Sequence, residues 1–392
     1  MAPSFSHSDS VLTIDCDAIA DNWRALDRMS SQRTQTAAVI KADAYGLGAC
    51  AIAPYLAAAG CKIFFVMSAQ EGAALRATLA NHGYASAGIF CLAGLMRGQE
   101  QAYLDNALMP VINDPEQLAR VSMMARKSGI VVPSALHLDT GMTRLGLSNT
   151  DIGWLIEQLS EDKTLLDGID LRYIMSHLTS SESVAYQSNE SQWQTFNGLH
   201  GYFPGVKASL ANSGGILLGS KFHFDLIRPG ISLYGQHPFG MPTTSEPEPQ
   251  IAQLGKVVRW DARILQIRRE KKGAKVGYNG THTLERDSVI LSASMGYADG
   301  YRRSLDGKAT IAIEGITAPV IGRISMDITT VDVTDIPESI LWKAESVCVL
   351  GDHYTLAQMA QDANTNPYEI LTGLGQRPHR LYQSNVMSDD AQ

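Results

Sequence analysis

The strongest constraint on the fold is a regular alternation of short apolar runs with longer, helix-like segments in the first part of the chain. Strands that alternate with helices form parallel sheets, because each parallel connection needs a crossover long enough for a helix. Eight strand–helix units predict a (β/α)8 barrel of the TIM type, although a doubly wound sheet would give the same local pattern. The eight runs are Ala37–Lys41, Lys62–Met67, Ala87–Leu92, Leu108–Asn113, Ala135–Asp139, Leu171–His177, Lys207–Ala211 and Leu226–Ser232.

Two of the segments between these runs carry helix boundary signals. Ser68 and Glu71 have the spacing of a capping box, in which each side chain bonds a backbone amide of the first turn, and they predict a helix over residues 68–79. Asp114, followed by a proline, and the later Gly129 are the expected start and stop signals of a second helix. These helices fit the spaces between the predicted strands.

The character of the sequence changes after the eighth run. His237–Gln250 reads HPFGMPTTSEPEPQ, a Pro-rich polar stretch typical of a linker. We therefore expect a barrel over residues 1–240 and a second domain over residues 251–392. Short β-branched runs with few helical patterns predict that the second domain is mostly antiparallel β-structure. Its runs are Val257–Ile267, Ser288–Ser294, Lys308–Ile313, Ala318–Ile321, Thr329–Thr334 and Ser346–Leu350.

The composition argues against several classes of protein. The net charge of −8 speaks against a nucleic-acid-binding surface, and 45% hydrophobic residues speak against general disorder. No apolar stretch reaches the roughly eighteen residues of a membrane span, and the N-terminus does not resemble a signal peptide. The five cysteines include no CxxC pair, so we expect no metal site and no disulfide framework. Together these features predict a cytoplasmic protein.

The clearest chemical signal is AVIKADAYGLG, in which a buried run ends in Lys41 and a Gly-containing turn follows. Reacting groups of barrels lie at the carboxyl ends of the strands. A lysine at this place loses hydration, which lowers its pKa and makes it a nucleophilic amine that can form a Schiff base. A lysine that only lays its stem along apolar surface would fit the same position.

This stretch resembles the cofactor-lysine signature of alanine racemases, which are fold-type-III pyridoxal-phosphate enzymes. Eight further motifs resemble those of the family in the same order, and the resemblance extends from about Val11 to Tyr382. They are HLDTGMTRLG (His137–Gly146), IMSHLTSSE (Ile174–Glu182), LANSGG (Leu210–Gly215), IRPGISLYG (Ile227–Gly235), VGYNGTH (Val276–His282), GYADGYRR (Gly296–Arg303), GRISMD (Gly322–Asp327) and YEILT (Tyr368–Thr372).

The resemblance implies pyridoxal phosphate as cofactor and two catalytic bases, Lys41 and Tyr278, on opposite faces of the substrate Cα. It also implies a head-to-tail homodimer in which Tyr278 reaches the partner's active site from the β domain. A free tyrosine has a pKa near 10 and is a poor base at neutral pH. By resemblance a chain of Tyr278, His177 and Arg228 lowers this pKa, and Arg228 faces the pyridine nitrogen of the cofactor.

The resemblance also distributes the remaining ligands. Barrels often bind phosphate in the loops after their last strands, where backbone amides and hydroxyls are available. The implied cofactor-binding residues besides the lysine are Tyr45, His177, Asn212, Ser213, Arg228, Gly230, Ile231 and Tyr368. The implied substrate-binding residues are Arg144, the backbone of Met326, and Tyr297. The implied entry channel consists of Tyr297, Arg303, Arg323, Glu182 and Tyr368.

One position departs from the family pattern. Many members carry a carbamylated lysine two residues before the Asp of the DTGM motif, and its negative charge holds the substrate-binding arginine. Here that residue is His137, which forms no stable carbamate. We therefore expect an unmodified His137, with a chloride-like anion or a polar side chain in contact with Arg144.

The sequence thus predicts an alanine racemase of this family that interconverts L- and D-alanine and supplies D-alanine for peptidoglycan. A broader amino-acid racemase, acting for example on serine, is the alternative with the same machinery. A fold-type-III decarboxylase would contact the pyridine nitrogen through an acidic residue, which Arg228 argues against. A single-domain pyridoxal-phosphate-binding homeostasis protein would lack the β domain that carries Tyr278.

Overall fold

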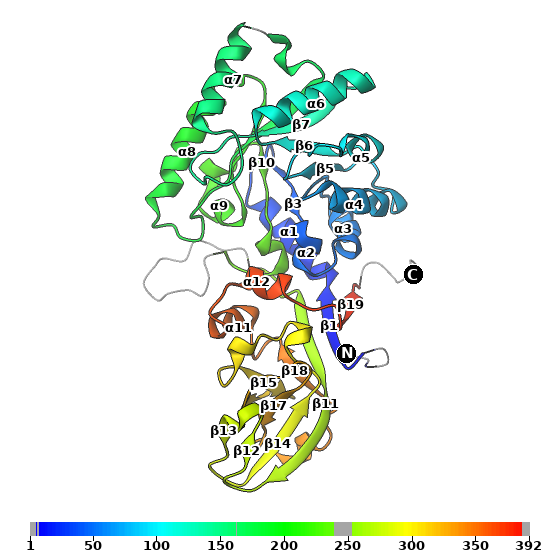
Figure 1. Cartoon of the computed structure of the whole chain (residues 1–392), viewed down its shortest axis with the longest axis vertical. Helices are drawn as coiled ribbons and strands as arrows, with labels where there is room; N and C mark the ends of the chain where they lie inside the picture. The colour runs from blue at the N-terminus through cyan, green and yellow to red at the C-terminus, as the bar shows by residue number, and fades with distance from the viewer. Residues whose placement is uncertain (1–4, 6–7, 162, 239–252, 386–392) are drawn as a thin grey trace. The chain divides into compact units, whose positions relative to one another are not determined.

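The computed structural model describes residues 5, 8–161, 163–238 and 253–385. The predicted linker His237–Gln250 therefore lies outside the described residues from position 239 onward. The chain divides into two compact units, Ala18–Gly255 and the combination of Met1–Asp17 with Lys256–Gln392. Figure 1 shows their elements.

The first unit is built on parallel strands, as the alternating pattern predicts. Seven strands pair in chain order from β3 to β9, and every pairing is parallel. The eighth strand, β10, pairs in parallel with β2, which directly precedes β3. The strands are β2 (Gln35–Thr36), β3 (Ala38–Val39), β4 (Ile63–Val66), β5 (Gly88–Cys91), β6 (Met109–Ile112), β7 (Val132–His137), β8 (Ile169–Met175), β9 (Lys207–Ser209) and β10 (Leu226–Ile227).

Backbone hydrogen bonds on both sides of β10 close the sheet into a barrel. On one side Arg228 N donates to Ala211 O at 2.9 Å, beyond the end of β9. On the other side Ala37 N donates to Ile227 O and Val39 N to Pro229 O, both at 2.9 Å. The predicted (β/α)8 barrel is confirmed, and the doubly wound sheet, which has open edges, is excluded.

The barrel interior is filled by apolar side chains from successive strands of the sheet. Stacked rings of Phe65 and Phe90, with centroids 5.0 Å apart, form part of this core, and Tyr173 meets Phe90 edge-on. The buried cluster comprises Ala37, Phe65, Phe90, Val111, Ala135, Tyr173, Met175 and Leu226.

Helices follow the strands and lie outside the sheet (Figure 1). The helices of this part of the chain are α1 (Cys16–Arg28), α2 (Lys41–Tyr45), α3 (Ala49–Ala58), α4 (Ala69–Asn81), α5 (Glu100–Asp105), α6 (Pro115–Ser128), α7 (Asn149–Glu161), α8 (Gln187–His200) and α9 (Ser213–Leu217).

The predicted boundaries of α4 and α6 are confirmed, with one difference. Asp114 caps α6 by accepting from Gln117 N at 2.7 Å, and Gly129 ends it in a left-handed conformation with φ 68°. Ser68 caps α4 by accepting from Glu71 N at 3.2 Å. The carboxylate of Glu71, however, bonds Met67 N rather than returning to the Ser68 amide, so the reciprocal half of the predicted capping box does not form.

The second unit is mostly antiparallel, as predicted. Its central strand β11 pairs antiparallel with β1, β14 and β18. The strands are β1 (Ser10–Asp15), β11 (Val258–Glu270), β12 (Lys275–Val276), β13 (His282–Thr283), β14 (Ser288–Ala293), β15 (Thr310–Ile313), β16 (Ile316–Pro319), β17 (Thr329–Asp332), β18 (Ser346–Leu350) and β19 (His379–Gln383). Three short helices accompany them, α10 (Glu338–Leu341), α11 (Leu356–Asp362) and α12 (Pro367–Thr372).

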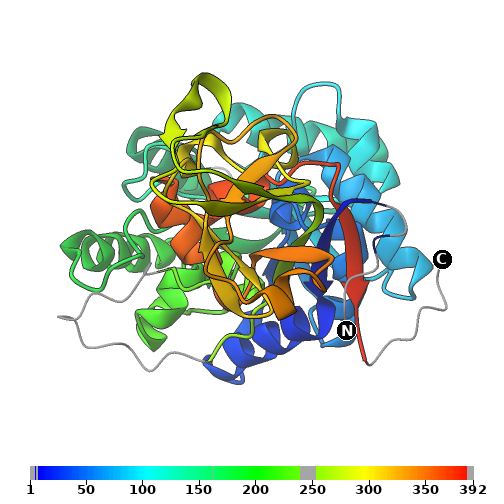
Figure 2. The same cartoon turned by 90° about the horizontal axis from the view of Figure 1, so that it is seen from below.

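The N-terminal strand belongs to this second unit, which differs from the expected barrel span of 1–240. β1 lies between β11, with which it is antiparallel, and β19, with which it is parallel (Figures 1 and 2). The run Ser10–Asp15 has the same local pattern as a barrel strand. Only its pairing with strands far along the chain decides the sheet to which it belongs.

No helix among the described residues is both long enough and apolar enough to cross a membrane.

The placement of β1 predicts where a core mutation at the N-terminus acts. Leu12 is fully buried and lies opposite Trp260 of β11 and Arg380 of β19. Leu12→Ala leaves a cavity and should lower the free energy of unfolding by about 3 kcal/mol. Hydrogen exchange should rise in peptides of β11 and β19. Thr13→Ala on the same strand is the matched control, with an expected loss of about 0.5 kcal/mol. Faster exchange confined to the barrel strands would contradict the assignment.

Candidate functional site

Lys41 lies at the carboxyl end of a barrel strand, as the sequence predicts. It follows β3, and the preceding residue, Ile40, donates its amide to Phe65 O of β4 at 2.9 Å. Burial lowers the pKa of Lys41, and the nearby Arg144 lowers it further, while Glu71 opposes the change. A lysine with a lowered pKa holds more of its amine in the neutral, nucleophilic form.

The chain turns sharply after Lys41 through four successive non-glycine residues with positive φ. Ala42, Asp43, Ala44 and Tyr45 have φ of 51°, 54°, 52° and 58°. Each such residue costs roughly 1 to 2 kcal/mol, so surrounding contacts must hold the turn. Two hydrogen bonds hold it within this segment of the chain. Ala44 N donates to Ile40 O at 2.9 Å, and Ala49 N donates to Asp43 Oδ1 at 2.7 Å.

The turn carries Tyr45 to the loop that follows β10. A methyl group added at Gly230 would lie 2.4 Å from Tyr45 Oη, so the loop backbone and the tyrosine hydroxyl lie close together. Gly230 N donates to Ser213 Oγ at 2.9 Å. The structure thus brings together Tyr45, Ser213 and Gly230, with Ile231 next in the chain. Hydroxyls and backbone amides of this kind are the donors that a phosphate group needs.

Asn212 has a structural role in the same loop. It is the N-cap of the short helix α9, and its Oδ1 accepts from Gly215 N at 2.9 Å. This cap fixes the direction in which Ser213 leaves the strand end. The predicted residue therefore lies at the site, with its side-chain oxygen bonded to the protein.

Arg228 is buried below the barrel mouth and is held by three acceptors. It donates to Ser209 Oγ, to Ser176 O at 2.6 Å and to Leu210 O at 3.5 Å. Burial lowers its pKa, and an arginine still keeps its charge. Among the described residues Arg228 makes no hydrogen bond to the ring of His177, so the predicted chain of Tyr278, His177 and Arg228 has no direct His–Arg bond here.

His177 stands in a strongly cationic environment. Its pKa lies well below 6.5, because burial and the charges of Arg228, Arg144 and Lys41 all disfavour a second proton. The ring is therefore neutral at physiological pH. A neutral imidazole offers one donor and one acceptor.

His137 is neutral for the same reasons, and its tautomer is determined. Its Nδ1 lies 2.9 Å from Asn113 Oδ1. The Asn113 amide nitrogen donates to Leu92 O and Val111 O, so its oxygen is the acceptor and His137 Nδ1 carries the proton. Burial, with Arg228, lowers the pKa of His137 to about 4. Its Nε2 is then an acceptor. No local signal in the sequence points to Asn113, because its contact with His137 joins the ends of two neighbouring strands.

Arg144 lies on a loop that returns to the end of β7. The carboxylate of Asp139 accepts from the amides of Gly141, Met142 and Thr143 at 2.8 to 2.9 Å. Leu147 N donates to His137 O at 2.8 Å and closes the loop. Within the described part of the chain the Arg144 side chain makes no hydrogen bond or ion pair, so the expected polar side-chain contact does not form there.

The other predicted residues lie in the second unit and are exposed. Tyr278 is 69% exposed, Met326 53%, Tyr297 43% and Tyr368 40%. Tyr278 begins a turn whose preceding Gly277 has φ 75° and packs against the backbone of Arg323. These four residues belong to a different compact unit from the residues of the barrel.

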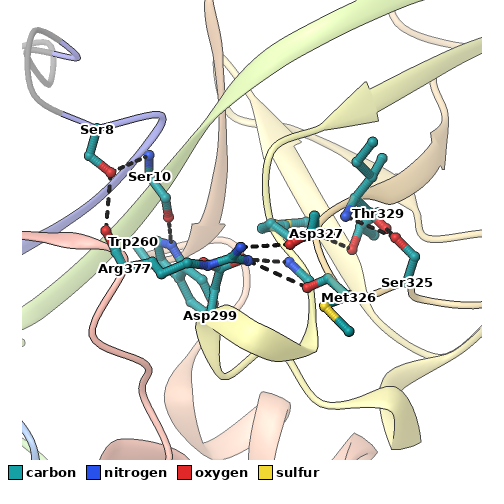
Figure 3. A network of polar contacts seen from close by, with 12 residues as sticks. Ser8, Ser10, Trp260, Asp299, Ser325, Met326, Asp327, Thr329 and Arg377 are labelled. Carbon is teal, nitrogen blue, oxygen red and sulfur yellow. Dashed lines mark hydrogen bonds and ion pairs between the residues drawn. The ribbon is translucent and has the colours of Figure 1, made fainter.

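A network of polar contacts surrounds one of these exposed positions, Met326 (Figure 3). Tyr297 N donates to Ser325 O, and Ala298 N donates to Met326 O, both at 3.1 Å. The Arg377 guanidinium donates two hydrogen bonds to the Asp299 carboxylate, at 2.9 and 2.8 Å, and one to Asp327 Oδ1 at 2.6 Å. The turn bearing Tyr297 is thereby fixed against the turn bearing Met326. Sequence analysis missed Arg377, which lies outside the motifs.

The remaining predicted channel residues are Arg303, which begins a 3-10 turn of the second unit, and Glu182, which is exposed on a barrel loop.

A cavity of about 510 Å³ lies elsewhere, at the amino ends of the barrel strands, lined by Gln35, Ile63, Gly88 and Lys207 among others. It contains none of the predicted site residues, and reacting groups of barrels lie at the opposite ends of the strands.

Comparison with known proteins matches both units to one family. Residues 14–238 match the N-terminal domain model of alanine racemase, and residues 257–382 match the C-terminal domain model. The alanine racemase of Rhodospirillum rubrum is 40% identical over 95% of this chain and 96% of its own. A catabolic alanine racemase of Agrobacterium fabrum is 41% identical over 96% of this chain and 93% of its own.

Two solved structures are similar over nearly the whole length. The alanine racemase of Bartonella henselae, with covalently bound pyridoxal phosphate, has 37% identity and a TM-score of 0.85, covering 95% of this chain and 99% of its own. The biosynthetic alanine racemase of Pseudomonas aeruginosa has 30% identity and a TM-score of 0.83, covering 96% and 100%. With both domains matched and a strand-end lysine at the barrel mouth, the chain belongs to the alanine racemase family.

Proposed function

We propose that the chain is an alanine racemase that uses pyridoxal phosphate to interconvert L- and D-alanine. The observation that carries the proposal is the position of Lys41, a partly desolvated amine at the end of β3 whose turn leads to the Tyr45–Gly230 contact. Family membership supports it, since relatives that match over nearly the full length bear this name.

The residues at the barrel mouth fit the cofactor by their chemistry. Lys41 would bind it covalently, and Arg228 would donate to its ring nitrogen. The hydroxyls and backbone amides of Tyr45, Ser213, Gly230 and Ile231 would hold its phosphate. A side chain at Gly230 would collide with Tyr45 Oη. The full proposed set is Lys41, Tyr45, His177, Asn212, Ser213, Arg228, Gly230, Ile231 and Tyr368. When bound, pyridoxal phosphate accepts the electron pair left at Cα when an amino acid loses its α-proton.

Racemisation needs a proton removed from one face of Cα and another delivered to the opposite face. We assign one face to Lys41 and the other to Tyr278 of the partner subunit in a homodimer. Tyr278 is 69% exposed, so its hydroxyl is accessible to a second subunit. The neutral His177 would donate its one ring N–H to the tyrosine oxygen, which favours the phenolate that acts as a base.

Substrate selection is assigned to three groups. Arg144 would bind the carboxylate of the amino acid, and a guanidinium can do so through two parallel hydrogen bonds. The backbone amide of Met326 would donate to the same carboxylate, and the ring of Tyr297 would narrow the access to a methyl-sized side chain. Arg377 holds the turns of these two residues together. A broader racemase acting on serine is the alternative, and racemisation rates across a panel of L-amino acids separate the two.

The proposed physiological role is the supply of D-alanine for peptidoglycan in the cytoplasm. Similar proteins include both a catabolic and a biosynthetic alanine racemase, so the opposite direction of flux is the alternative. Growth dependence of a deletion strain on added D-alanine tests the biosynthetic role.

We assign the orientation of Arg144 to an anion bound beside it, in the place where His137 departs from the family pattern. His137 contributes no negative charge, so a chloride-like ion would complete the neutralisation of the cationic mouth.

A prediction about the cofactor follows from the position of Lys41. Borohydride reduction of the protein loaded with pyridoxal phosphate should attach the label to Lys41, as read by peptide mapping. Lys41→Ala should lose racemisation by at least about a thousandfold, because it removes both the attachment point and one base. Lys62→Ala, at an exposed lysine before β4, is the control and should keep the label and the activity. A label found on another lysine would falsify the assignment.

The proposed sharing of sites between subunits is tested by complementation. Lys41→Ala and Tyr278→Phe chains should each be inactive alone. After mixing and reassociation, heterodimers should regain activity, since each contains one site with both an intact lysine and an intact tyrosine. Native mass spectrometry measures the fraction of heterodimer. Full formation of heterodimers without activity would place both bases in one chain.

The state of His137 makes a prediction about pH. NMR of the labelled ring should find the proton on Nδ1 and a pKa near 4. An unfolded histidine titrates near 6.5, so the stability that neutral His137 contributes should fall as the pH drops from about 6.5 to about 4. Asn113→Asp places a carboxylate against Nδ1 and should raise the pKa of His137.

The same residue should make the enzyme insensitive to added bicarbonate, and His137→Lys should introduce a dependence on CO2. Rates in degassed and bicarbonate-supplemented buffer measure this. A CO2-dependent rate in the unmodified enzyme would refute the role of His137.

A further inference from the structure

Glu71 joins the ends of two neighbouring barrel strands beside Lys41. Its Oε1 accepts from Ala42 N at 3.0 Å, and its Oε2 accepts from Met67 N at 2.6 Å. Ala42 directly follows Lys41, and Met67 directly follows β4. One carboxylate therefore bridges the turn that carries the lysine to the adjacent strand. Hydrogen bonds to a charged acceptor are roughly twice as strong as neutral ones.

The chain contains a matched example of the same position with different chemistry. Gln117 is the third residue of α6, as Glu71 is of α4. Gln117 Oε1 accepts from Asn113 N at 3.0 Å, which corresponds to the Met67 bond. Its Nε2 donates to Ala93 O at 3.1 Å. An amide fits there because the neighbouring loop offers a carbonyl, whereas a carboxylate fits at Glu71 because Ala42 offers an N–H.

The Ala42 amide is the point at which the left-handed turn begins. Four successive residues from Ala42 to Tyr45 adopt φ between 51° and 58°. This conformation is unfavourable for residues with a Cβ, and it persists only where other contacts hold it. The bond from Glu71 anchors the first of these residues and so determines the direction of the Lys41 backbone.

We propose that Glu71 is a positioning residue for Lys41: its carboxylate clamps the Ala42 and Met67 amides, holds the left-handed turn, and supplies a negative charge beside the lysine. The proposal rests on the role of Lys41 in the proposed function. It adds a residue outside every motif that carries the family resemblance.

The charges around Lys41 agree with this role. Arg144 and burial favour the neutral amine and lower its pKa, and Glu71 opposes them. His177 also faces this set of charges and is neutral. The Glu71 charge therefore limits the fall of the Lys41 pKa that burial and Arg144 cause, an effect that a merely structural contact would not have.

The test compares Glu71→Gln and Glu71→Asp with Glu116→Gln in the full-length protein. Glu116 is an exposed acidic residue in the first turn of α6 and controls for the effect of charge at a helix N-terminus. Amide exchange in peptides covering residues 40–48 and 66–68 reports the clamp. Competitive labelling with acetic anhydride across pH, on protein freed of pyridoxal phosphate so that the Lys41 amine is available, reports the pKa of Lys41 without any measurement of activity. Peptide mass spectrometry reads the label.

Glu71→Gln removes the charge and leaves one acceptor oxygen for two donors. We expect amide exchange at Ala42 or Met67 to rise about tenfold, since one charge-assisted bond is lost, and the Lys41 labelling curve to move to lower pH. Glu71→Asp keeps the charge but shortens the reach. It should raise amide exchange and leave the labelling curve near that of the wild type. Glu116→Gln should change neither quantity.

Unchanged exchange and an unchanged labelling curve in Glu71→Gln overturn the proposal. If that variant fails to fold, the Asp variant decides, because wild-type exchange at Ala42 and Met67 in it overturns the clamp. Failure of the proposed function is distinguishable. In that case borohydride traps no pyridoxal phosphate on Lys41 of the wild type, while the effects of Glu71 on exchange and labelling persist.

Discussion

Closure of the parallel barrel is the interaction on which the rest of the site depends. Backbone bonds from Ala37 and Val39 to the β10 segment, and from Arg228 to the end of β9, join the first and last strands. Closure places the carboxyl ends of all strands around one mouth. Residues as distant in sequence as Tyr45 and Gly230 come into contact only because of it. Without closure, Lys41 would still end its strand, but the loop that contains Gly230 would not lie near its turn.

The mouth that closure creates is cationic, and its histidines respond to that charge. Arg228 is buried on three acceptors, and Lys41 and Arg144 lie nearby. Both His137 and His177 are kept neutral by burial and these positive charges. A site of this kind suits an anionic ligand such as a phosphate or a carboxylate, because the ligand then supplies the missing negative charge. The neutral histidines provide acceptors without adding to the repulsion.

The side chains at the third position of two barrel helices, α4 and α6, connect neighbouring strand ends through hydrogen bonds. Glu71 and Gln117 each bond the residue that ends their own strand and a backbone group of the preceding strand–helix unit. The sequence pattern of a capping box correctly located the start of α4 but predicted a bond to the wrong amide. The Glu71 carboxylate bonds the amides of Ala42 and Met67 instead, because these two N–H groups lie close together and need an acceptor.

The sequence by itself determined the barrel strands, the antiparallel domain and the place of Lys41. Apolar periodicity and capping residues are local signals, and a strand-end lysine is visible without its neighbours. The motifs in family order also located Tyr45, Ser213 and Gly230. Tertiary structure alone decided that Ser10–Asp15 joins β11 and β19, because its local pattern fits either domain and pairing depends on partners far along the chain.

Tertiary structure also decided the contacts that tune the site. The tautomer of His137 depends on Asn113, one strand away, and the turn of Tyr297 depends on Arg377. The left-handed run after Lys41 opposes the intrinsic preference of alanine and tyrosine, so no local rule predicts it. Each of these features exists because groups distant in sequence bond each other at short range. A sequence records the residues that can form such bonds, and only the closed fold decides which of them meet.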